Sequence, residues 1–197
     1  MLKYLTGIIC FITASSFVQN GIVYCSFTNA SFESDIRKES IFPNGWTSQS
    51  PNNTPDILPG AWGLDIPAYH GKTCLGLVSR EDGSSENIGQ DLPKTLKSGE
   101  CYSFSVYLSH ADYYVKYDRP CRLKVWGGAQ AGDKQILLAT SPLISHKEWK
   151  QYNFKFTPTQ NCAAITFEAT YAPGVSIKYK GNILLDKCSD IFKCEKA

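Results

Sequence analysis

The nine residues Cys101-Tyr-Ser-Phe-Ser-Val-Tyr-Leu-Ser109 decide the fold class. Large apolar side chains occupy every second position from Tyr102 to Leu108, and three serines and a tyrosine occupy the positions between them, from Ser103 to Ser109. Because successive side chains of a β-strand point to opposite faces, this alternation places the apolar residues on one face. The segment is therefore predicted to be a strand with one core face and one nearly polar face.

The same period of two recurs along the chain, and no window shows helical spacing over three turns. Turn residues such as proline, glycine and asparagine separate the alternating segments. Nine short strands in this arrangement predict an all-β fold, a two-sheet antiparallel β-sandwich of the jelly-roll type. The other eight strands are expected at Ile22–Phe27, Thr73–Val78, Glu86–Leu92, Cys121–Trp126, Gln135–Thr140, Lys150–Phe156, Ala164–Ala169 and Ile183–Asp186.

Residues 43–71 interrupt this pattern with five prolines and four glycines. Trp46, Trp62 and Tyr69 lie within the segment, and aromatic residues at this density argue against disorder. Loops of this length within a domain are often functional. The chain of 197 residues, 43% of them hydrophobic, is long enough for one core. We therefore expect a single domain over residues 17–197 that contains a long loop at 43–71.

The N-terminus has the features of an export signal. Lys3 precedes an apolar stretch of 14 residues from Leu5 to Val18, which is shorter than the roughly 20 residues of a membrane-spanning helix. Ala14 and Ser16 place small side chains where a signal peptidase reads the chain, so residues 1–16 are predicted to be removed. The mature chain is then expected to be secreted, periplasmic or on the outer cell surface, without a transmembrane span.

The charge of the chain is nearly balanced. Lys and Arg number 20 against 18 for Asp and Glu, giving a formal charge of +2, which becomes +1 when Lys3 is removed with the signal. No long basic block occurs. The sequence therefore offers no electrostatic case for nucleic acid as a partner.

Eight cysteines are scattered along the chain without a CxxC pair or a histidine at zinc-site spacing, which favours disulfides in an oxidising compartment. Loss of Cys10 with the signal leaves an odd number, seven, so at least one thiol has another use or another partner. Cys25 is a candidate for lipidation, but Tyr24 stands where a small residue is required. A disulfide from Cys25, on the first strand, is the preferred interpretation, and the connectivity stays open.

Six short segments occur in an order that resembles carbohydrate-binding-module-like (galactose-binding-like) jelly-roll domains of secreted and surface proteins of Bacteroidetes-type bacteria. They are Asn29-Ala-Ser-Phe-Glu33, Pro43-Asn-Gly-Trp46, Thr54-Pro-Asp56, Glu86-Asn-Ile-Gly-Gln-Asp-Leu92, Leu96-Lys-Ser-Gly-Glu-Cys-Tyr102 and Asn182-Ile-Leu-Leu-Asp186. The resemblance covers roughly residues 22–190. It implies a sandwich fold and a binding function.

The resemblance also implies a structural calcium ion held by Glu33 and Asp186 together with backbone carbonyls. Calcium takes several hard oxygen ligands, and two carboxylates would neutralise its charge. The alternative is that Asp186 faces solvent or pairs with Lys180 or Lys187.

Two groups of side chains could bind a sugar, which needs flat aromatic rings and polar partners for hydroxyl groups. The first is the strand face of Arg122, Lys124 and Trp126, opposite the apolar face of Cys121, Leu123 and Val125. The second is the loop of residues 112–118. For Trp46, Trp62 and Trp126, ordinary packing is the competing interpretation. The residues predicted to bind the ligand are Tyr113, Tyr114, Tyr117, Arg122, Lys124, Trp126 and Trp62, with Asn87 and Gln90 as sources of amide contacts.

No catalytic motif is present, and the three histidines lie in separate segments, so the chain is not expected to be an enzyme. Carboxylates such as Glu86, Asp91 and Glu168 could form a pair, as in most β proteins. The principal hypothesis is a non-catalytic module that binds a polysaccharide or glycoconjugate. The alternative is a protein-binding accessory subunit of a bacterial surface complex for secretion, gliding or adhesion.

Overall fold

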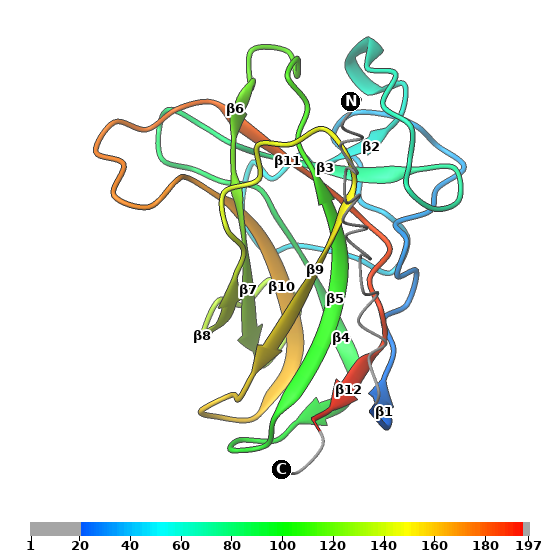
Figure 1. Cartoon of the computed structure of the whole chain (residues 1–197), viewed down its shortest axis with the longest axis vertical. Coiled ribbons are helices and arrows are strands. Elements are labelled where there is room, and N and C mark those ends of the chain that lie inside the picture. The colour runs from blue at the N-terminus through cyan, green and yellow to red at the C-terminus, as the bar shows by residue number, and fades with distance from the viewer. Residues whose placement is uncertain (1–20, 195–197) are drawn as a thin grey trace, which may run out of the picture.

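A computed structural model describes residues 21–194 of the chain as two antiparallel sheets packed face to face (Figure 1). We name the eight-stranded sheet sheet A and the four-stranded sheet sheet B. Sheet A contains β1 (Val23–Cys25), β2 (Asp56–Leu58), β3 (Cys74–Ser79), β5 (Tyr102–Ser109), β6 (Arg119–Pro120), β9 (Lys150–Phe156), β11 (Gly181–Asp186) and β12 (Ile191–Lys193). Sheet B contains β4 (Asn87–Leu96), β7 (Arg122–Gly128), β8 (Ile136–Thr140) and β10 (Cys162–Thr170). The predicted β-sandwich is confirmed.

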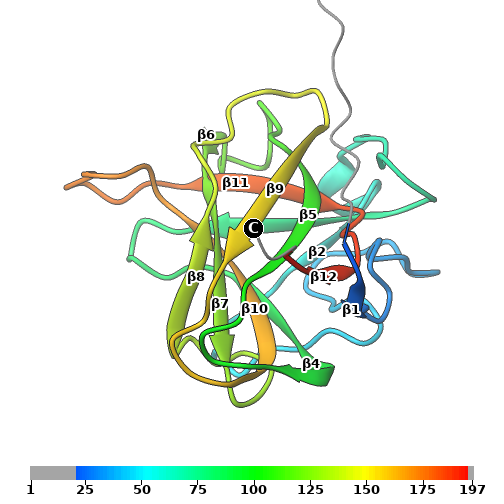
Figure 2. The ribbon, with the colours of Figure 1, turned by 60° about the horizontal axis from the view of Figure 1, so that its bottom comes forward.

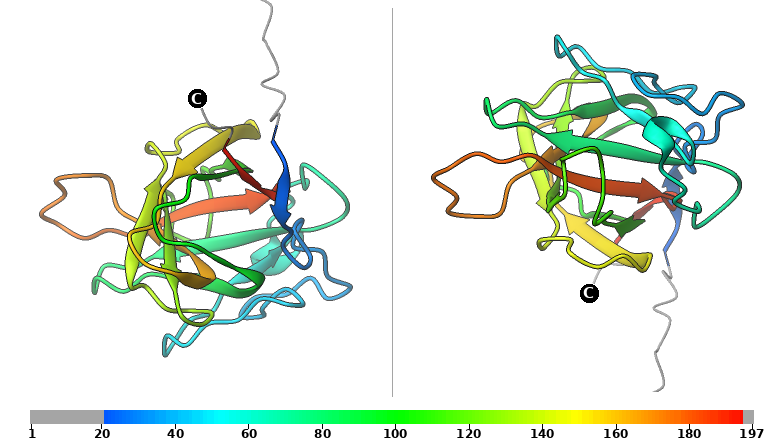
Figure 3. Two further views of the ribbon diagram at one scale, coloured as in Figure 1. Left: turned by 90° about the horizontal axis from the view of Figure 1, so that it is seen from below. Right: turned by 90° about the horizontal axis from the view of Figure 1, so that it is seen from above.

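Strand β5 is the centre of sheet A. One of its edges pairs with β9 along its whole length, from Tyr102 to Leu108. The other edge is shared, because β12 pairs with its beginning and β11 with its end. Sheet A then continues from β11 through β3 to β2, and the segment between β10 and β11 projects away from the sandwich (Figures 2 and 3). This order brings β2, β3 and β11 side by side.

The core lies between the sheets, as the alternation in β5 predicts. Tyr102, Phe104, Val106 and Leu108 are all fully buried there. The ring of Phe104 lies 5.8 Å from that of Phe167 on β10, so aromatic packing joins the two sheets. Each large side chain removed from water in this way stabilises the fold by about 1.5–3 kcal/mol.

All nine predicted strands are present, with shifts of a few residues at their ends. The short strands β2, β6 and β12 were not predicted. Strand β2 lies within the loop 43–71 and is buried at all three positions, so it shows no alternation by which it could be recognised. That loop therefore adds an edge strand to sheet A, and within it the backbone turn η1 (Ala61–Gly63) follows β2.

Two buried amides hold the first part of this loop against the sandwich. The Nε2 atom of Gln90 donates hydrogen bonds to the backbone carbonyls of Thr28, at 2.9 Å, and Gly45, at 2.8 Å. Asn87 accepts a hydrogen bond from the hydroxyl of Ser48 at 2.7 Å. Asn87 and Gln90 were expected to offer amide contacts to a ligand. Instead they are buried and bonded within the chain, because the loop backbone needs partners where it crosses the sheet.

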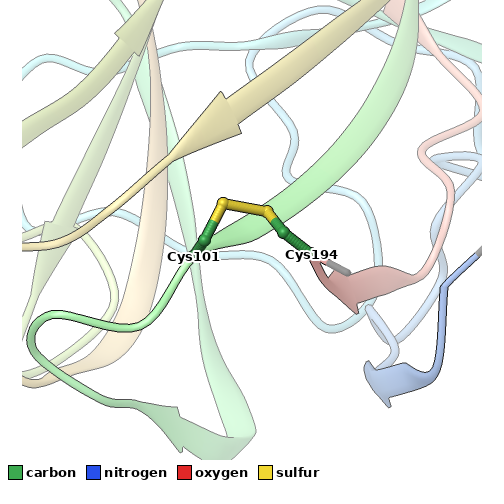
Figure 4. The surroundings of a disulfide bond; sticks show 2 residues. All are labelled: Cys101 and Cys194. Carbon is green, nitrogen blue, oxygen red and sulfur yellow. A yellow bond between two sulfur atoms is a disulfide. The ribbon is translucent and has the colours of Figure 1, made fainter. Parts of the chain in front are cut away.

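One disulfide, Cys101–Cys194, joins the start of β5 to the end of β12 in the described part of the chain (Figure 4). It spans 93 residues, and closing a loop of that size stabilises a protein by about 4–5 kcal/mol in the chain-entropy account. The described residues also contain five free cysteines, all buried: Cys25, Cys74, Cys121, Cys162 and Cys188.

The preferred assignment of Cys25 to a disulfide is wrong. Cys25 does lie on β1, but its side chain is a buried free thiol that packs in the hydrophobic core, and burial raises its pKa to about 11. A buried thiol of this kind behaves as a small apolar side chain. Cys10 and the predicted signal peptide lie outside the described residues. Among residues 21–194, no helix is long and apolar enough to cross a membrane.

Candidate functional site

The face of sheet A that points away from the core is covered by two loops. We call residues 59–72 the Trp62 loop and residues 110–118 the Tyr114 loop. Both lie at the same end of the sandwich, beside β2 and β11 (Figures 1 and 3). They bury a second, smaller apolar cluster against the outer face of sheet A. Its members include Leu58, Ala61, Leu64, Ala111, Tyr114 and Leu184.

Tyr114 is the central contact between the Tyr114 loop and the sheet. Its side chain is buried, with 1% of its surface exposed, and its hydroxyl donates a hydrogen bond of 2.8 Å to Oδ2 of Asp56. The ring lies on Gly76 of β3, where an added Cβ would come within 2.0 Å of the tyrosine oxygen. The missing side chain of Gly76 therefore makes room for the ring. Tyr114 was predicted to bind the ligand, and the structure buries it, because this strand glycine lets the ring pack against the sheet.

The side-chain amide of Asn182, on β11, holds the backbone of the Tyr114 loop. Its Oδ1 accepts a hydrogen bond from the N–H of Ala111 at 3.0 Å. Its Nδ2 donates to the carbonyls of Ala111, at 2.8 Å, and Tyr117, at 2.6 Å. Asn182 is fully buried, so these bonds satisfy its amide without water.

Trp62 lies at the tip of the backbone turn η1 in an unusual conformation. Its φ is 57°, and it stands between Gly60 and Gly63, whose φ values of 110° and 70° are also positive. The Trp62 side chain is 51% exposed, and its Nε1 donates a hydrogen bond of 3.1 Å to Oδ2 of Asp56. A positive φ is costly for any residue except glycine, and such strain clusters at ligand sites.

Between the two loops lies a pocket of about 130 Å³. Its buried lining consists of Asp56, Val78, Glu86 and Tyr114. The base is therefore partly apolar and contains two carboxyl groups and a phenol. Such a mixture of apolar surface with a few placed polar groups is typical of small-molecule sites.

The rim of the pocket is more accessible. Trp62 is exposed there, and Thr54, Arg80, Val115 and Tyr117 are partly buried. Val115 has a φ of 50°, which is a marked outlier for a β-branched residue. Both loops thus present a strained residue to the same pocket.

Glu86 is the most perturbed acid of the pocket. Its Oε1 accepts a hydrogen bond from the Thr54 hydroxyl at 2.7 Å and pairs with Arg80, and its Oε2 accepts one from the Val78 N–H at 3.0 Å. Burial raises the pKa of Glu86 to about 7; Thr54 and Arg80 lower it, and the neighbouring Asp56 raises it. Burial also raises the pKa of Asp56. The pocket therefore holds two buried acids against one guanidinium.

Three of the predicted ligand residues, Trp62, Tyr114 and Tyr117, are brought together at this pocket. Tyr113 points elsewhere: it is 68% exposed and lines a separate hollow with His110 and Lys147. The hollow has a volume of about 260 Å³.

The other predicted group lies on the outer face of sheet B. Arg122, Lys124 and Trp126 share one face of β7, as the alternation predicts, and all three are partly buried. The indole Nε1 of Trp126 donates a hydrogen bond of 2.8 Å to Glu168, and Lys124 lies 5.3 Å from the centre of the indole ring. Arg122 donates from Nε to the carbonyl of Ser141 at 2.8 Å. These side chains are engaged with their own neighbours.

Asp186 is fully buried, and burial raises the pKa of its carboxyl. Its oxygens accept hydrogen bonds from the Ser31 hydroxyl and from the backbone N–H groups of His70 and Lys187, at 2.9, 2.9 and 2.6 Å. Ser31 also bonds the Nδ1 of His70 at 2.9 Å. A Ser-His-Asp triad requires the carboxylate on the imidazole ring, whereas Asp186 bonds the backbone of His70. This cluster therefore lacks the geometry of a catalytic triad.

The two predicted calcium ligands are each held by N–H donors. Both carboxylate oxygens of Glu33 accept from the backbone N–H of Lys72, at 3.1 Å. A calcium ion at Glu33 and Asp186 would have to replace such donors with carbonyl or water oxygens. Across the described residues, no group of three or more His, Cys, Asp or Glu side chains forms a metal-ligand cluster. Both carboxyl groups thus already accept hydrogen bonds, and calcium stays a prediction.

Sequence reasoning did not single out Asp56, Thr54 or Arg80 for the site, and it named Glu86 only as one of many carboxylates. Asp56 precedes Ile57 and Leu58, and an acid directly before a buried apolar pair is a usable signal. Arg80 and Thr54 carry no such signal, because they reach the pocket through the pairing of β2 with β3.

The fold and the site define a β-sandwich binding domain with a loop-built aromatic pocket on one sheet. The family described as "Carbohydrate binding domain" matches residues 26–173, and the chain belongs to this family. This confirms the resemblance to carbohydrate-binding modules. No curated protein matches the chain.

Solved structures share the fold at low sequence identity. The CBM22-1 xylan-binding domain of Xyn10C from Paenibacillus barcinonensis is 20% identical, with a TM-score of 0.56, over 90% of this chain and 97% of that one. A xylan-binding domain from CBM 22 is 17% identical, with a TM-score of 0.53, over 91% and 99%. A cyclase from Fischerella sp. is 13% identical, with a TM-score of 0.55, over 87% and 98%. At these identities the likeness concerns the fold alone.

Proposed function

We propose that this chain is a non-catalytic carbohydrate-binding module and that it binds sugar in the pocket between the Trp62 and Tyr114 loops. The single observation that carries the proposal is the half-exposed indole of Trp62, held at a positive φ at the rim of a pocket with a polar, buried base. Membership in the carbohydrate-binding family supports it.

The pocket offers the chemistry that a sugar requires. The indole of Trp62 and the phenol of Tyr117 provide aromatic surface for the C–H face of a pyranose ring. Arg80 uses Nη2 for its bonds to Thr54 and Glu86, and no bond from its Nε or Nη1 is found within residues 21–194, so these N–H groups are available to hydroxyl oxygens. The carboxyl oxygens of the base accept from hydroxyl hydrogens.

A glycan array followed by calorimetry tests the site. We expect Trp62→Ala to weaken binding of the best glycan by at least about 30-fold, the loss typical of an aromatic anchor. Trp126→Ala is the matched control, since it removes an indole from the other sheet, and it should leave the affinity unchanged. If Trp126→Ala weakens binding and Trp62→Ala does not, the binding site lies on the face of β7.

A chain that binds no glycan and instead copurifies with a membrane protein would support the alternative, an accessory subunit of a surface complex. That outcome would contradict binding in the pocket.

Absence of catalysis is also part of the proposal. Both acids of the pocket base accept hydrogen bonds from neighbours: Glu86 from Thr54 and Val78, and Asp56 from Ser40 and Tyr114. These bonds hold the carboxyl groups in place as acceptors. Prolonged incubation with the bound oligosaccharide should give no new product by mass spectrometry, and turnover that Glu86→Gln abolishes would contradict this part.

The proposal also includes export of the chain and binding of a calcium ion. We propose that the chain is secreted after cleavage near Phe17, and the intact mass of the exported protein tests the cleavage site, together with any lipid on Cys25. The calcium ion that the resemblance implies at Glu33 and Asp186 predicts a melting temperature that falls with EDTA and recovers with calcium. An unchanged melting temperature would contradict the calcium site.

A further inference from the structure

The pocket has room for no more than one sugar ring. Its volume of about 130 Å³ is slightly below that of an engineered protein cavity of roughly 150 Å³ that holds one six-membered ring, benzene. Two consecutive sugar units are far larger than this. A ligand therefore places one unit inside and leaves any further units outside.

The two loops are joined at the base of the pocket, where the buried Asp56 lies between them. One atom, Oδ2 of Asp56, accepts hydrogen bonds from both Trp62, at 3.1 Å, and Tyr114, at 2.8 Å. Asn182 fixes the Tyr114 loop from β11. These bonds close the base of the pocket. A sugar unit that enters as far as this base can have neighbours only on the side of the entrance, as a terminal unit has.

The charged side chains at the bottom of the pocket limit which sugars can enter it. Asp56 and Glu86 are two acids, and Arg80 is the one cation among the lining residues. Arg80 is already paired with Glu86. A sugar that carries a carboxylate would add a third acid to a base that holds one cation, and like charges in a buried site repel.

We propose that this pocket takes a single neutral sugar unit at the terminus of a glycan chain or branch. The inference rests on the proposed function and narrows its ligand class. It separates this module from one that binds the interior of a polysaccharide.

Calorimetry with oligosaccharides of increasing length tests the inference. The probes are the free sugars and the two- to six-unit oligosaccharides of the gluco, galacto, manno and xylo series. For the series that binds, we expect the affinity to change by less than about threefold between two and six units, because only the terminal unit enters the pocket. An affinity that rises more than tenfold with length would overturn the inference and leave the proposed function standing.

Oligosaccharides with a chemically modified end test directly whether the pocket binds a terminal unit. The hexasaccharide of a hexose series is prepared with its non-reducing terminal unit oxidised to a uronic acid, or with its reducing end reduced to an alditol. One of these changes should lower the affinity at least tenfold, whereas indifference to both would contradict terminal recognition. Binding by none of the series contradicts the proposed function as well.

Variants connect the result to the pocket. Tyr117→Ala should lower the affinity for the terminal unit, and Tyr113→Ala, in the same loop but outside the pocket, should not. Circular dichroism of both variants checks that each is folded. An equal loss in both variants would contradict the assignment to this pocket.

Discussion

The outer faces of the two sheets carry similar side chains but differ in how those side chains are held. On sheet B, Trp126 donates its indole N–H to Glu168, and Lys124 covers the ring. On sheet A, Trp62 bonds Asp56 and keeps half of its surface open to solvent beside a pocket. The ring on sheet B is thus engaged with its own neighbours, and the ring on sheet A is open on one side.

The backbone shows the same difference. Trp126 lies in a regular strand, whereas Trp62 and Val115 hold positive φ angles at the edge of one pocket. Strained residues persist only where the surrounding structure fixes them, and they cluster where ligands bind. The comparison teaches that, in this fold, a loop over sheet A leaves an aromatic ring open beside a pocket, whereas the strand face of sheet B engages its ring with neighbouring side chains.

The largest expected effect comes from Gly76→Ala, which acts on the face of sheet A. The new Cβ would come within 2.0 Å of the Tyr114 oxygen, so the ring and its loop must move. We expect the free energy of unfolding to fall by about 3 kcal/mol, at the upper end for overpacking, and glycan binding to be lost. Urea denaturation measures the free energy of unfolding, and calorimetry measures glycan binding.

Adding Tyr114→Phe to Gly76→Ala removes the closest clashing atom, so the double variant should be more stable than the sum of the single effects predicts. A Gly76→Ala variant of wild-type stability would show that Tyr114 does not rest on this glycine.

Asn182→Ala is expected to have the next largest effect. It removes the hydrogen bonds that hold Ala111 and Tyr117 and leaves their buried backbone groups unpaired. We expect a loss of about 2 kcal/mol of unfolding free energy. Affinity should fall too, because the Tyr114 loop loses its anchor. A stability loss with full affinity would show that the pocket does not depend on this anchor.

The strands and the core could be predicted from the sequence because their signal is local. The period of two in β5 and β7 gave both the strands and their buried faces, and the burial of Tyr102 and Leu123 confirms it. The aromatic residues of the two loops were also recognised. Which of their rings would be exposed was not predictable: Tyr114 and Tyr113 are neighbours in sequence, yet one is buried and the other open.

The pocket itself depends on contacts between distant segments. Asp56 meets Tyr114 across 58 positions of sequence, and Arg80 joins them only because β3 pairs with β2. Two features of the fold make this possible: a glycine on β3 beneath the tyrosine, and an unpredicted edge strand that carries Asp56. Neither has a signal of its own in one sequence, since an isolated glycine or a three-residue strand is common.

The pH dependence of stability provides a third test. The pKa of Glu86 is about 7 in the folded protein against an ordinary value of 4.5. Between these values the unfolded chain releases a proton that the folded chain keeps, so the free energy of unfolding falls as the pH rises from about 4.5 to about 7. We therefore expect a lower melting temperature at pH 7 than at pH 4.5, measured by scanning calorimetry at the two pH values.

Glu86→Gln should make the free energy of unfolding depend less on pH between about 4.5 and about 7, whatever its effect on stability at a single pH. Asp186, whose pKa burial also raises, stays in both proteins and cancels in the comparison. Asp56 is coupled to Glu86, and loss of the Glu86 charge lowers the pKa of Asp56, which adds to the flattening. Equal slopes in wild type and variant would show that Glu86 is not the group that titrates.

The smallest expected effect lies on sheet B and bears directly on the contrast between the two faces. Trp126→Phe keeps an aromatic ring beside Lys124, makes that ring smaller and removes the N–H that Glu168 accepts at 2.8 Å. Because Glu168 keeps its ion pair with Lys134, at 2.7 Å, we expect a loss of less than about 1 kcal/mol in urea denaturation. Glycan affinity should be unchanged. A tenfold loss of affinity at unchanged stability would mean that the strand face of sheet B, and not the loops of sheet A, contacts the sugar.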